Sequence, residues 1–282
     1  MKYRHACHAG NFADVVKHVV LVAVLTRLVE KARPLFYLDT HAGRARYDLG
    51  SRDSAAEAAR GILRLAAADP KGMPSPLRRY LDLVRTFNAG NETVPRIYPG
   101  SPCIAAALLR PDDHAAFCDI EPGEAQLLAR EFHGDRRFGV HCRDGFEALA
   151  ALLPPREKRG LVLIDPPYEE QQTDMERVAD ALATTAQRWP QGVLAAWYPI
   201  KLASVIARFH RRLLDAGLRR VLAVELCVHP DDSRAGLNGS GVLLVNPPWK
   251  SDGDLRAGLP ALHAILAPDG SGRWRVDWLA GE

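Results

Sequence analysis

The chain has 282 residues, of which 47% are hydrophobic and 25% charged, and its formal net charge is +3 at pH 7. This length fits one large α/β domain or two small ones, and the composition excludes disordered, collagen-like and small disulfide-rich proteins. The longest apolar stretches fall far short of the ~20 residues that span a bilayer. Because no CxxC pair occurs and Asp14 precedes any apolar run, we expect a cytoplasmic protein with no signal peptide and no membrane contact.

Seven short runs rich in apolar and β-branched residues predict strands, in chain order at residues 35–40, 115–120, 138–143, 160–164, 193–198, 221–228 and 242–245. Helical periodicity separates most of them, at residues 13–31, 104–109, 124–133, 174–188 and 201–214. Strands that alternate with helices predict a mostly parallel α/β sheet with helices on both faces. Only a turn-rich segment separates the last two runs, which predicts a hairpin with an antiparallel strand.

A long segment separates the first predicted strand from the second. Within it, residues 52–68 and 76–87 predict two helices, because apolar residues of the second recur on one face. We interpret residues 45–95 as a small helical insertion within a single domain that comprises residues 1–282.

The clearest chemical motif is Asp165-Pro166-Pro167-Tyr168, directly after the apolar run 160–164. Functional sites of parallel sheets lie at the carboxyl ends of strands, and two consecutive prolines exclude helix and ladder pairing there. An exocyclic amine such as adenine N6 is a weak nucleophile, because its lone pair is delocalised into the ring. We predict that Asp165 and the Pro166 carbonyl accept its two N–H groups and favour the pyramidal amine. Tyr168 is expected to stack on the base.

A second motif of this kind, Asn246-Pro247-Pro248-Trp249, follows the last predicted strand. The strand before Asp165 is expected near the middle of a doubly wound sheet, whereas the strand before Asn246 is the last. We therefore place the reacting site at Asp165 and expect Trp249 to cover a sheet edge.

Acidic residues also follow three other predicted strands, at Asp39, Asp119 and Asp144. Neither GxGxxG nor GxxxxGK[ST] is present, which disfavours a nicotinamide dehydrogenase or a nucleoside triphosphate site. S-adenosylmethionine carries no phosphate but has a positive sulfonium, a ribose and an amino-acid tail, all suited to carboxylates. We predict that Asp119 binds its ribose hydroxyls and Asp144 its adenine amine, and we expect no metal site.

Several segments of the chain resemble the RlmJ-type 23S ribosomal RNA adenine-N6 methyltransferases. They are residues 3–5, 8–18, 38–43, 98–102, 144–146, 164–168, 197–199 and 246–249. The resemblance runs nearly end to end, and its N-terminal and Thr40-His41-Ala42-Gly43 segments are far more specific than the Asp-Pro-Pro-Tyr motif. It implies a class I S-adenosylmethionine-dependent methyltransferase fold, with a seven-stranded Rossmann-like sheet and a small helical insertion after the first strand.

The resemblance also implies roles for individual residues. The residues that it places around S-adenosylmethionine are His18, His41, Ser101, Asp144 and Gly145. Asp165 would contact both the cofactor and the target amine. Tyr3 would contact RNA, and His5 and Lys17 would assist substrate binding or catalysis.

We therefore predict N6-methylation of one adenine in 23S rRNA by a monomer without an obligate protein partner. Because the base must be unpaired or extruded, deproteinised or partly assembled RNA is the expected substrate. The alternatives are a DNA adenine-N6 methyltransferase, disfavoured by the lack of a sizeable target-recognition domain, and a non-catalytic RNA-binding protein of the same fold, disfavoured by the intact Asp-Pro-Pro-Tyr motif. The chain departs from the family pattern at Asp119, where Glu is familiar, and at Arg44, where a small residue follows the glycine.

Overall fold

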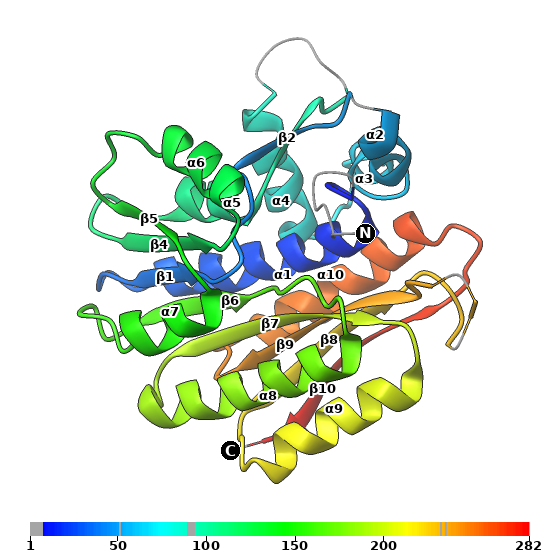
Figure 1. Cartoon of the computed structure of the whole chain (residues 1–282). Helices are drawn as coiled ribbons and strands as arrows, with labels where there is room; N and C mark the ends of the chain where they lie inside the picture. Colours follow the sequence, from blue (N-terminus) through cyan, green and yellow to red (C-terminus); the bar gives the residue numbers. More distant parts are fainter. Residues whose placement is uncertain (1–7, 51, 89–93, 232, 235, 282) are drawn as a thin grey trace.

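The computed structural model describes residues 8–50, 52–88, 94–231, 233–234 and 236–281 of the chain. The strands of its main sheet are β1 (Phe36–Asp39), β4 (His114–Asp119), β5 (Phe138–Cys142), β6 (Gly160–Ile164), β7 (Val193–Ile200), β8 (Val221–Cys227), β9 (Gly239–Val245) and β10 (Arg273–Ala280). They lie in the order β10-β8-β9-β7-β6-β1-β4-β5 (Figure 1). No helix in the described ranges combines the length and the apolar character needed to cross a membrane.

The strands from β5 to β7 along this order pair in parallel, and β9 runs antiparallel between β7 and β8. The mostly parallel sheet and the antiparallel hairpin of the last two predicted strands are therefore confirmed. The sheet has one strand more than the seven predicted, because β10 pairs antiparallel with β8 at its edge. Only Val276 of β10 is fully buried, so the strand lacks the apolar run by which the others were found.

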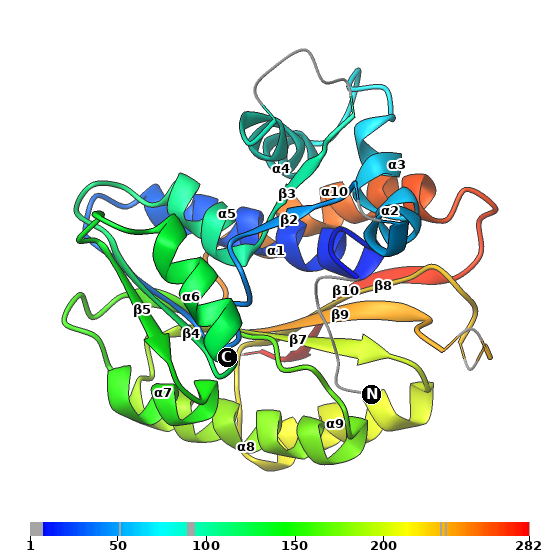
Figure 2. The same cartoon turned by 45° about the horizontal axis from the view of Figure 1, so that its top comes forward.

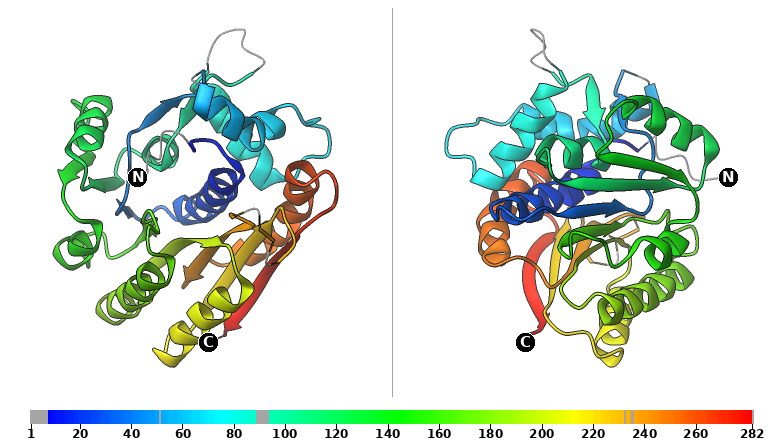
Figure 3. Two further views of the ribbon diagram at one scale, coloured as in Figure 1. Left: turned by 45° about the vertical axis from the view of Figure 1, so that its right-hand side comes forward. Right: turned by 90° about the vertical axis from the view of Figure 1, so that its left-hand side faces the viewer.

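Helices cover both faces of the sheet (Figures 1 and 3). One face carries α1 (Phe12–Val29), α5 (Ser101–Leu108), α6 (Pro122–Glu131) and α10 (Ser251–Leu266), and the other carries α7 (Gly145–Leu152), α8 (Gln171–Arg188) and α9 (Ala203–Asp215). Successive strand residues point to opposite faces, so Tyr37 packs in the apolar cluster of α1 and Leu38 in that of α8. The expected three-layer α/β fold is confirmed.

The segment between β1 and α5 contains β2 (Arg46–Asp48), α2 (Arg52–Ala59), α3 (Ile62–Ala66), α4 (Ser75–Thr86) and β3 (Ile97–Pro99), with β2 and β3 paired antiparallel. It lies over α1 and α10 (Figure 2). The prediction of one helix over residues 52–68 is wrong, because α2 and α3 are separated at Gly61. A Cβ there would lie 2.1 Å from the Gly10 carbonyl oxygen, so the chain before α1 passes directly against this position.

The parallel strands β5, β4, β1 and β6 bring four carboxylates together at their carboxyl ends, which form one edge of the sheet. Asp39 ends β1 and Asp119 ends β4, while Asp144 follows β5 and Asp165 follows β6. β1 has the later strands β4 and β6 on either side, so this edge includes the point where the strand order reverses. Ligands of doubly wound sheets bind at such points. Asn246 lies at the opposite edge, because β9 runs antiparallel to β7.

Candidate active site

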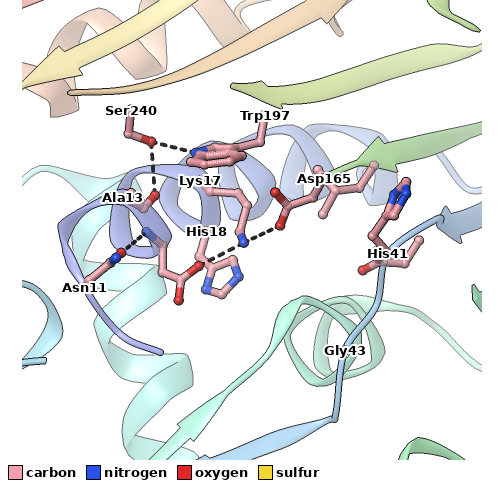
Figure 4. Close-up of polar contacts among 12 residues, drawn as sticks. Asn11, Ala13, Lys17, His18, His41, Gly43, Asp165, Trp197 and Ser240 are labelled. Carbon is pink, nitrogen blue, oxygen red and sulfur yellow. Dashed lines mark hydrogen bonds and ion pairs between the residues drawn. The ribbon is translucent and has the colours of Figure 1, made fainter. Parts of the chain in front are cut away.

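The Lys17 ammonium lies between two carboxylates at this edge. Its Nζ is 2.5 Å from Asp165 Oδ2 and 2.9 Å from Asp14 Oδ1 (Figure 4). Burial opposes the charge on Lys17, but the two carboxylates outweigh it and raise the pKa of Lys17 well above its ordinary value. Lys17 is therefore a permanent cation, held against the acidic residue of the Asp-Pro-Pro-Tyr motif.

Local sequence at the start of α1 explains how Lys17 is held. Asn11 is the N-cap, and its side-chain oxygen accepts the Asp14 backbone N–H at 2.9 Å. Asp14 Oδ2 accepts the Gly10 backbone N–H at 3.0 Å. Because residues three apart share one face of a helix, Asn11, Asp14 and Lys17 form a continuous polar line on an otherwise apolar helix.

His18 follows Lys17 in α1 and has different partners. Its Nδ1 is 2.7 Å from the Tyr98 hydroxyl, and the two rings stack with centroids 5.5 Å apart. The Tyr98 hydroxyl in turn lies 3.0 Å from that of Tyr80. The histidine is 1% exposed, so its packing against the insertion is established, while its contact with a cofactor stays a prediction.

Asp39 is a buried carboxylate at the end of β1. Burial raises its pKa to about 6, although hydrogen bonds and the Lys17 charge oppose that rise. The Tyr37 hydroxyl donates to Asp39 Oδ2 at 3.0 Å, and the Ser101 side chain also interacts with this carboxylate. By hydrogen-bond geometry, Oδ1 is left without a partner in the part of the chain that the structure describes. Ser101, another predicted cofactor residue, is buried at the first position of α5. The site therefore offers an unsatisfied buried acceptor.

The turn after β1 places His41 beside α7. His41 Nδ1 lies 2.7 Å from the Thr40 hydroxyl, and its ring packs edge-on against Phe146, with centroids 5.2 Å apart. Burial lowers the pKa of His41 to about 4, so the imidazole is neutral at physiological pH. It can accept or donate a hydrogen bond without adding a cation to the site.

Asp119 and Asp144 both accept backbone N–H groups of the loops at the carboxyl ends of the parallel strands. Asp119 accepts the Gly43 N–H and the Glu121 N–H, each at 2.8 Å. Asp144 caps α7 through the Phe146 N–H at 2.7 Å. These bonds fix the loops, and each carboxylate retains lone pairs that can accept from a ligand.

Charged neighbours complete the same two turns. The second oxygen of Asp144 pairs with Arg177 at 3.0 Å. The Arg44 Nε donates to Glu124 on α6 at 2.8 Å, so the large residue after the Gly43 turn is directed to α6 and leaves the Gly43–Asp119 hydrogen bond in place.

Tyr168 of the Asp-Pro-Pro-Tyr motif packs against β7. Its ring is 4% exposed within the apolar cluster of α8, and its hydroxyl donates to the Trp197 carbonyl at 2.5 Å. The Tyr168 and Trp197 rings meet edge-on, with centroids 5.5 Å apart. The packed ring holds the loop that carries Asp165 and the buried Pro166. Stacking of Tyr168 on a base stays a prediction.

The remaining predictions concern the Asn246–Trp249 motif and the N-terminal residues. Trp249 does not cover a sheet edge, because it is 84% exposed, and Asn246 donates to the Pro190 and Gly192 carbonyls at the edge opposite Asp165. The turn at Asn246 leaves the tryptophan projecting into solvent. The predicted RNA contacts Tyr3 and His5 lie outside the described residues.

Sequence reasoning missed two features of the site. Asp14 pairs with Lys17, and the three-residue spacing from Asn11 through Asp14 to Lys17 was the available signal. Trp197 donates to the Ser240 hydroxyl at 2.9 Å, and Ser240 donates to the Ala13 carbonyl at 3.1 Å, which ties β7 and β9 to the start of α1 (Figure 4). No local pattern relates Trp197 to Ser240, because only the sheet brings them together.

Comparisons with known proteins agree with this geometry. The family described as "Ribosomal RNA large subunit methyltransferase D, RlmJ" matches residues 32–280. Two proteins named "Ribosomal RNA large subunit methyltransferase J", from Escherichia coli (strain K12) and Haemophilus influenzae, are 42% and 40% identical to the chain, with 100% of each chain covered. The crystal structure of protein LPL1258 from Legionella pneumophila matches with a TM-score of 0.88 and 32% identity, over 96% of this chain and 98% of that one. The chain therefore belongs to the RlmJ family of ribosomal RNA large subunit methyltransferases, as the resemblance of its sequence motifs predicted.

Proposed function

We propose that this protein transfers a methyl group from S-adenosylmethionine to the N6 amine of one adenine in 23S rRNA. The observation that carries the proposal is the Asp165 carboxylate, held by Lys17 at the carboxyl end of β6 and followed by Pro166. With Oδ2 engaged by Lys17, Oδ1 is the oxygen that faces the amine. We further propose that the chain acts as a monomer, in the cytoplasm, on RNA that is deproteinised or partly assembled.

The residues of the chain orient the amine and take its proton. Asp165 Oδ1 and the Pro166 carbonyl accept the two N–H groups, which frees the nitrogen lone pair for attack. When bound, S-adenosylmethionine supplies an electrophilic methyl carbon on a positively charged sulfur; the N–C bond forms as the C–S bond breaks. The surplus proton on N6 then leaves to Asp165 or to solvent. No base is needed before the transfer, because the attacking amine is neutral.

The residues at the carboxyl edge fit the cofactor. The unpartnered buried oxygen of Asp39 suits a cationic group such as the ammonium of the amino-acid tail. Asp119 would bind the ribose, and Asp144, with Gly145 behind it, the adenine. His18, His41 and Ser101 would complete the pocket. Several carboxylates around one ligand favour a sulfonium compound over a phosphate-bearing one.

The test is methyl transfer from labelled S-adenosylmethionine to deproteinised 23S rRNA and, separately, to duplex DNA. We expect N6-methyladenosine at one site in rRNA, identified by mass spectrometry of nuclease fragments. We expect Asp165→Ala to lower kcat by about 10²–10³-fold, the scale of losing one transition-state hydrogen-bond partner. Asp180→Ala, which removes an exposed carboxylate paired with Arg212, is the control. Methylation of DNA alone, or near-normal turnover by Asp165→Ala, would refute the proposal.

A further inference from the structure

The buried ammonium of Lys17 is shared by two carboxylates, one on α1 and one in the loop after β6. Lys17 and Asp14 are 5% and 6% exposed at their side chains, whereas Asp165 is 12% exposed. Asp14 is fixed in the first turn of an 18-residue helix by the Gly10 N–H on Oδ2 and by its own N–H on Asn11. Asp165 is held by a loop between β6 and α8. The Asp14 carboxylate is therefore held by the backbone at the start of α1 as well as by Lys17, and Lys17 links it to Asp165.

Charge counting shows what Asp14 contributes. With Asp14 present, its negative charge offsets that of Lys17, so the carboxylate of Asp165 keeps an excess negative charge. Without it, the charges of Lys17 and Asp165 would largely cancel each other. Positive charge develops on the amine nitrogen during attack on a sulfonium, and a neutral pair stabilises that charge less than an anion does. Lys17 would also be free to move toward Asp165 Oδ1, the oxygen that accepts a hydrogen bond from the amine.

We propose that Asp14 is a positioning residue for methyl transfer: through Lys17, it fixes the Asp165 carboxylate and preserves its negative charge. The inference rests on the proposed function of Asp165. It also gives a reason for the close contact between the start of α1 and the insertion, because Gly10 contacts Asp14 through its N–H and Ile62 through its carbonyl.

The first test compares Asp14→Asn, which preserves side-chain volume, with the wild type. We expect kcat to fall about 10–100-fold, the cost of a small misplacement of reacting groups, while KM for rRNA and the affinity for S-adenosylmethionine change little. Asp254→Asn is a matched control, because Asp254 pairs with Arg27 at the other end of α1 at 2.7 and 2.8 Å. Its kcat should equal that of the wild type. An unchanged kcat in Asp14→Asn would overturn the proposal.

A double-mutant cycle separates positioning from a general structural role. If Asp14 acts through Lys17, Asp14→Asn should cost nothing more in a Lys17→Met background. Additive losses would show that Asp14 acts by another route and would overturn the inference. Wild type and Asp165→Ala are measured in the same series, so a wild type inactive on rRNA refutes the proposed function, whereas an active wild type matched by Asp14→Asn refutes only the role of Asp14.

The charge of Lys17 provides a readout that needs no activity. The titratable groups that face Lys17 are Asp14, Asp165, Asp39, Tyr47 and Tyr80. Burial lowers the pKa of Lys17, and the charge of Asp14 opposes this effect. The Lys17 pKa should therefore fall when that charge is removed. In protein labelled with ¹³Cε-lysine, the Lys17 resonance should titrate at lower pH in Asp14→Asn than in the wild type. Identical titration curves would refute the proposal, even if Asp14→Asn were poorly active through partial misfolding.

Discussion

Gly145, the first residue of α7, packs directly against the main chain of Thr40, the residue that follows β1. A Cβ at Gly145 would lie 2.0 Å from the Thr40 carbonyl oxygen. The contact joins two turns that we expect to enclose the cofactor, since His41 follows Thr40 and Asp144 precedes Gly145. Only glycine allows these two turns to approach so closely.

Gly145→Ala should therefore separate the two turns. We expect it to lower the free energy of unfolding by about 1–3 kcal/mol, as overpacking does, and to weaken S-adenosylmethionine binding at least tenfold. Calorimetric titration and thermal unfolding measure the two effects. Gly123→Ala is the control, because a Cβ at Gly123 meets nothing within 4 Å. Equal affinities in the two variants would contradict the role of this contact.

The raised pKa of Asp39 predicts that the folding stability of the protein depends on pH. The folded pKa of about 6 lies above the ordinary value of 3.8, so the folded protein holds more protons than the unfolded one between these values. Stability therefore falls as the pH rises through that window, by at most about 3 kcal/mol. Asp39→Asn should match the wild type below about pH 4 and be more stable above about pH 6, as measured by urea unfolding.

The same substitution should weaken cofactor binding. We expect wild-type affinity for S-adenosylmethionine to rise with pH through about 6, as the Asp39 carboxylate ionises, and the affinity of Asp39→Asn to lack this step. Calorimetric titrations between pH 5 and 8 compare the two proteins. A variant that binds as tightly as the wild type at pH 7.5 would remove Asp39 from the cofactor site.

Tyr168 should behave as a buried support for its loop. Tyr168→Phe loses only the hydrogen bond to the Trp197 carbonyl, so we expect about 1 kcal/mol of destabilisation and nearly normal methyl transfer. Tyr168→Leu also removes buried ring volume and should unfold at a lower temperature than Tyr168→Phe. If Tyr168 stacked on the base, Tyr168→Leu would raise KM for RNA without this loss of stability. Thermal unfolding and RNA titrations separate the two outcomes.

Much of the fold was predictable because the central parallel strands are buried on both faces. Such strands appear as continuous apolar runs, and β6 is buried at every position. β10 was missed because charged residues alternate with its apolar ones, so the strand has no continuous apolar run. The helix break at Gly61 was missed for a different reason. The helix break there depends on the backbone of Gly10, which is distant in sequence, and no local propensity records that contact.

The candidate site likewise has features that the sequence predicted and features that only the tertiary structure shows. Sequence alone identified Asp165 and the carboxylates after three other strands, because a turn after an apolar run marks a carboxyl end wherever it occurs. Tertiary structure decided which groups those carboxylates meet. It placed Lys17 between Asp14 and Asp165, buried the Tyr168 ring and left one oxygen of Asp39 unsatisfied. Strand ends follow from local hydrophobicity, whereas charge pairing and burial depend on residues that only folding brings within a few ångströms.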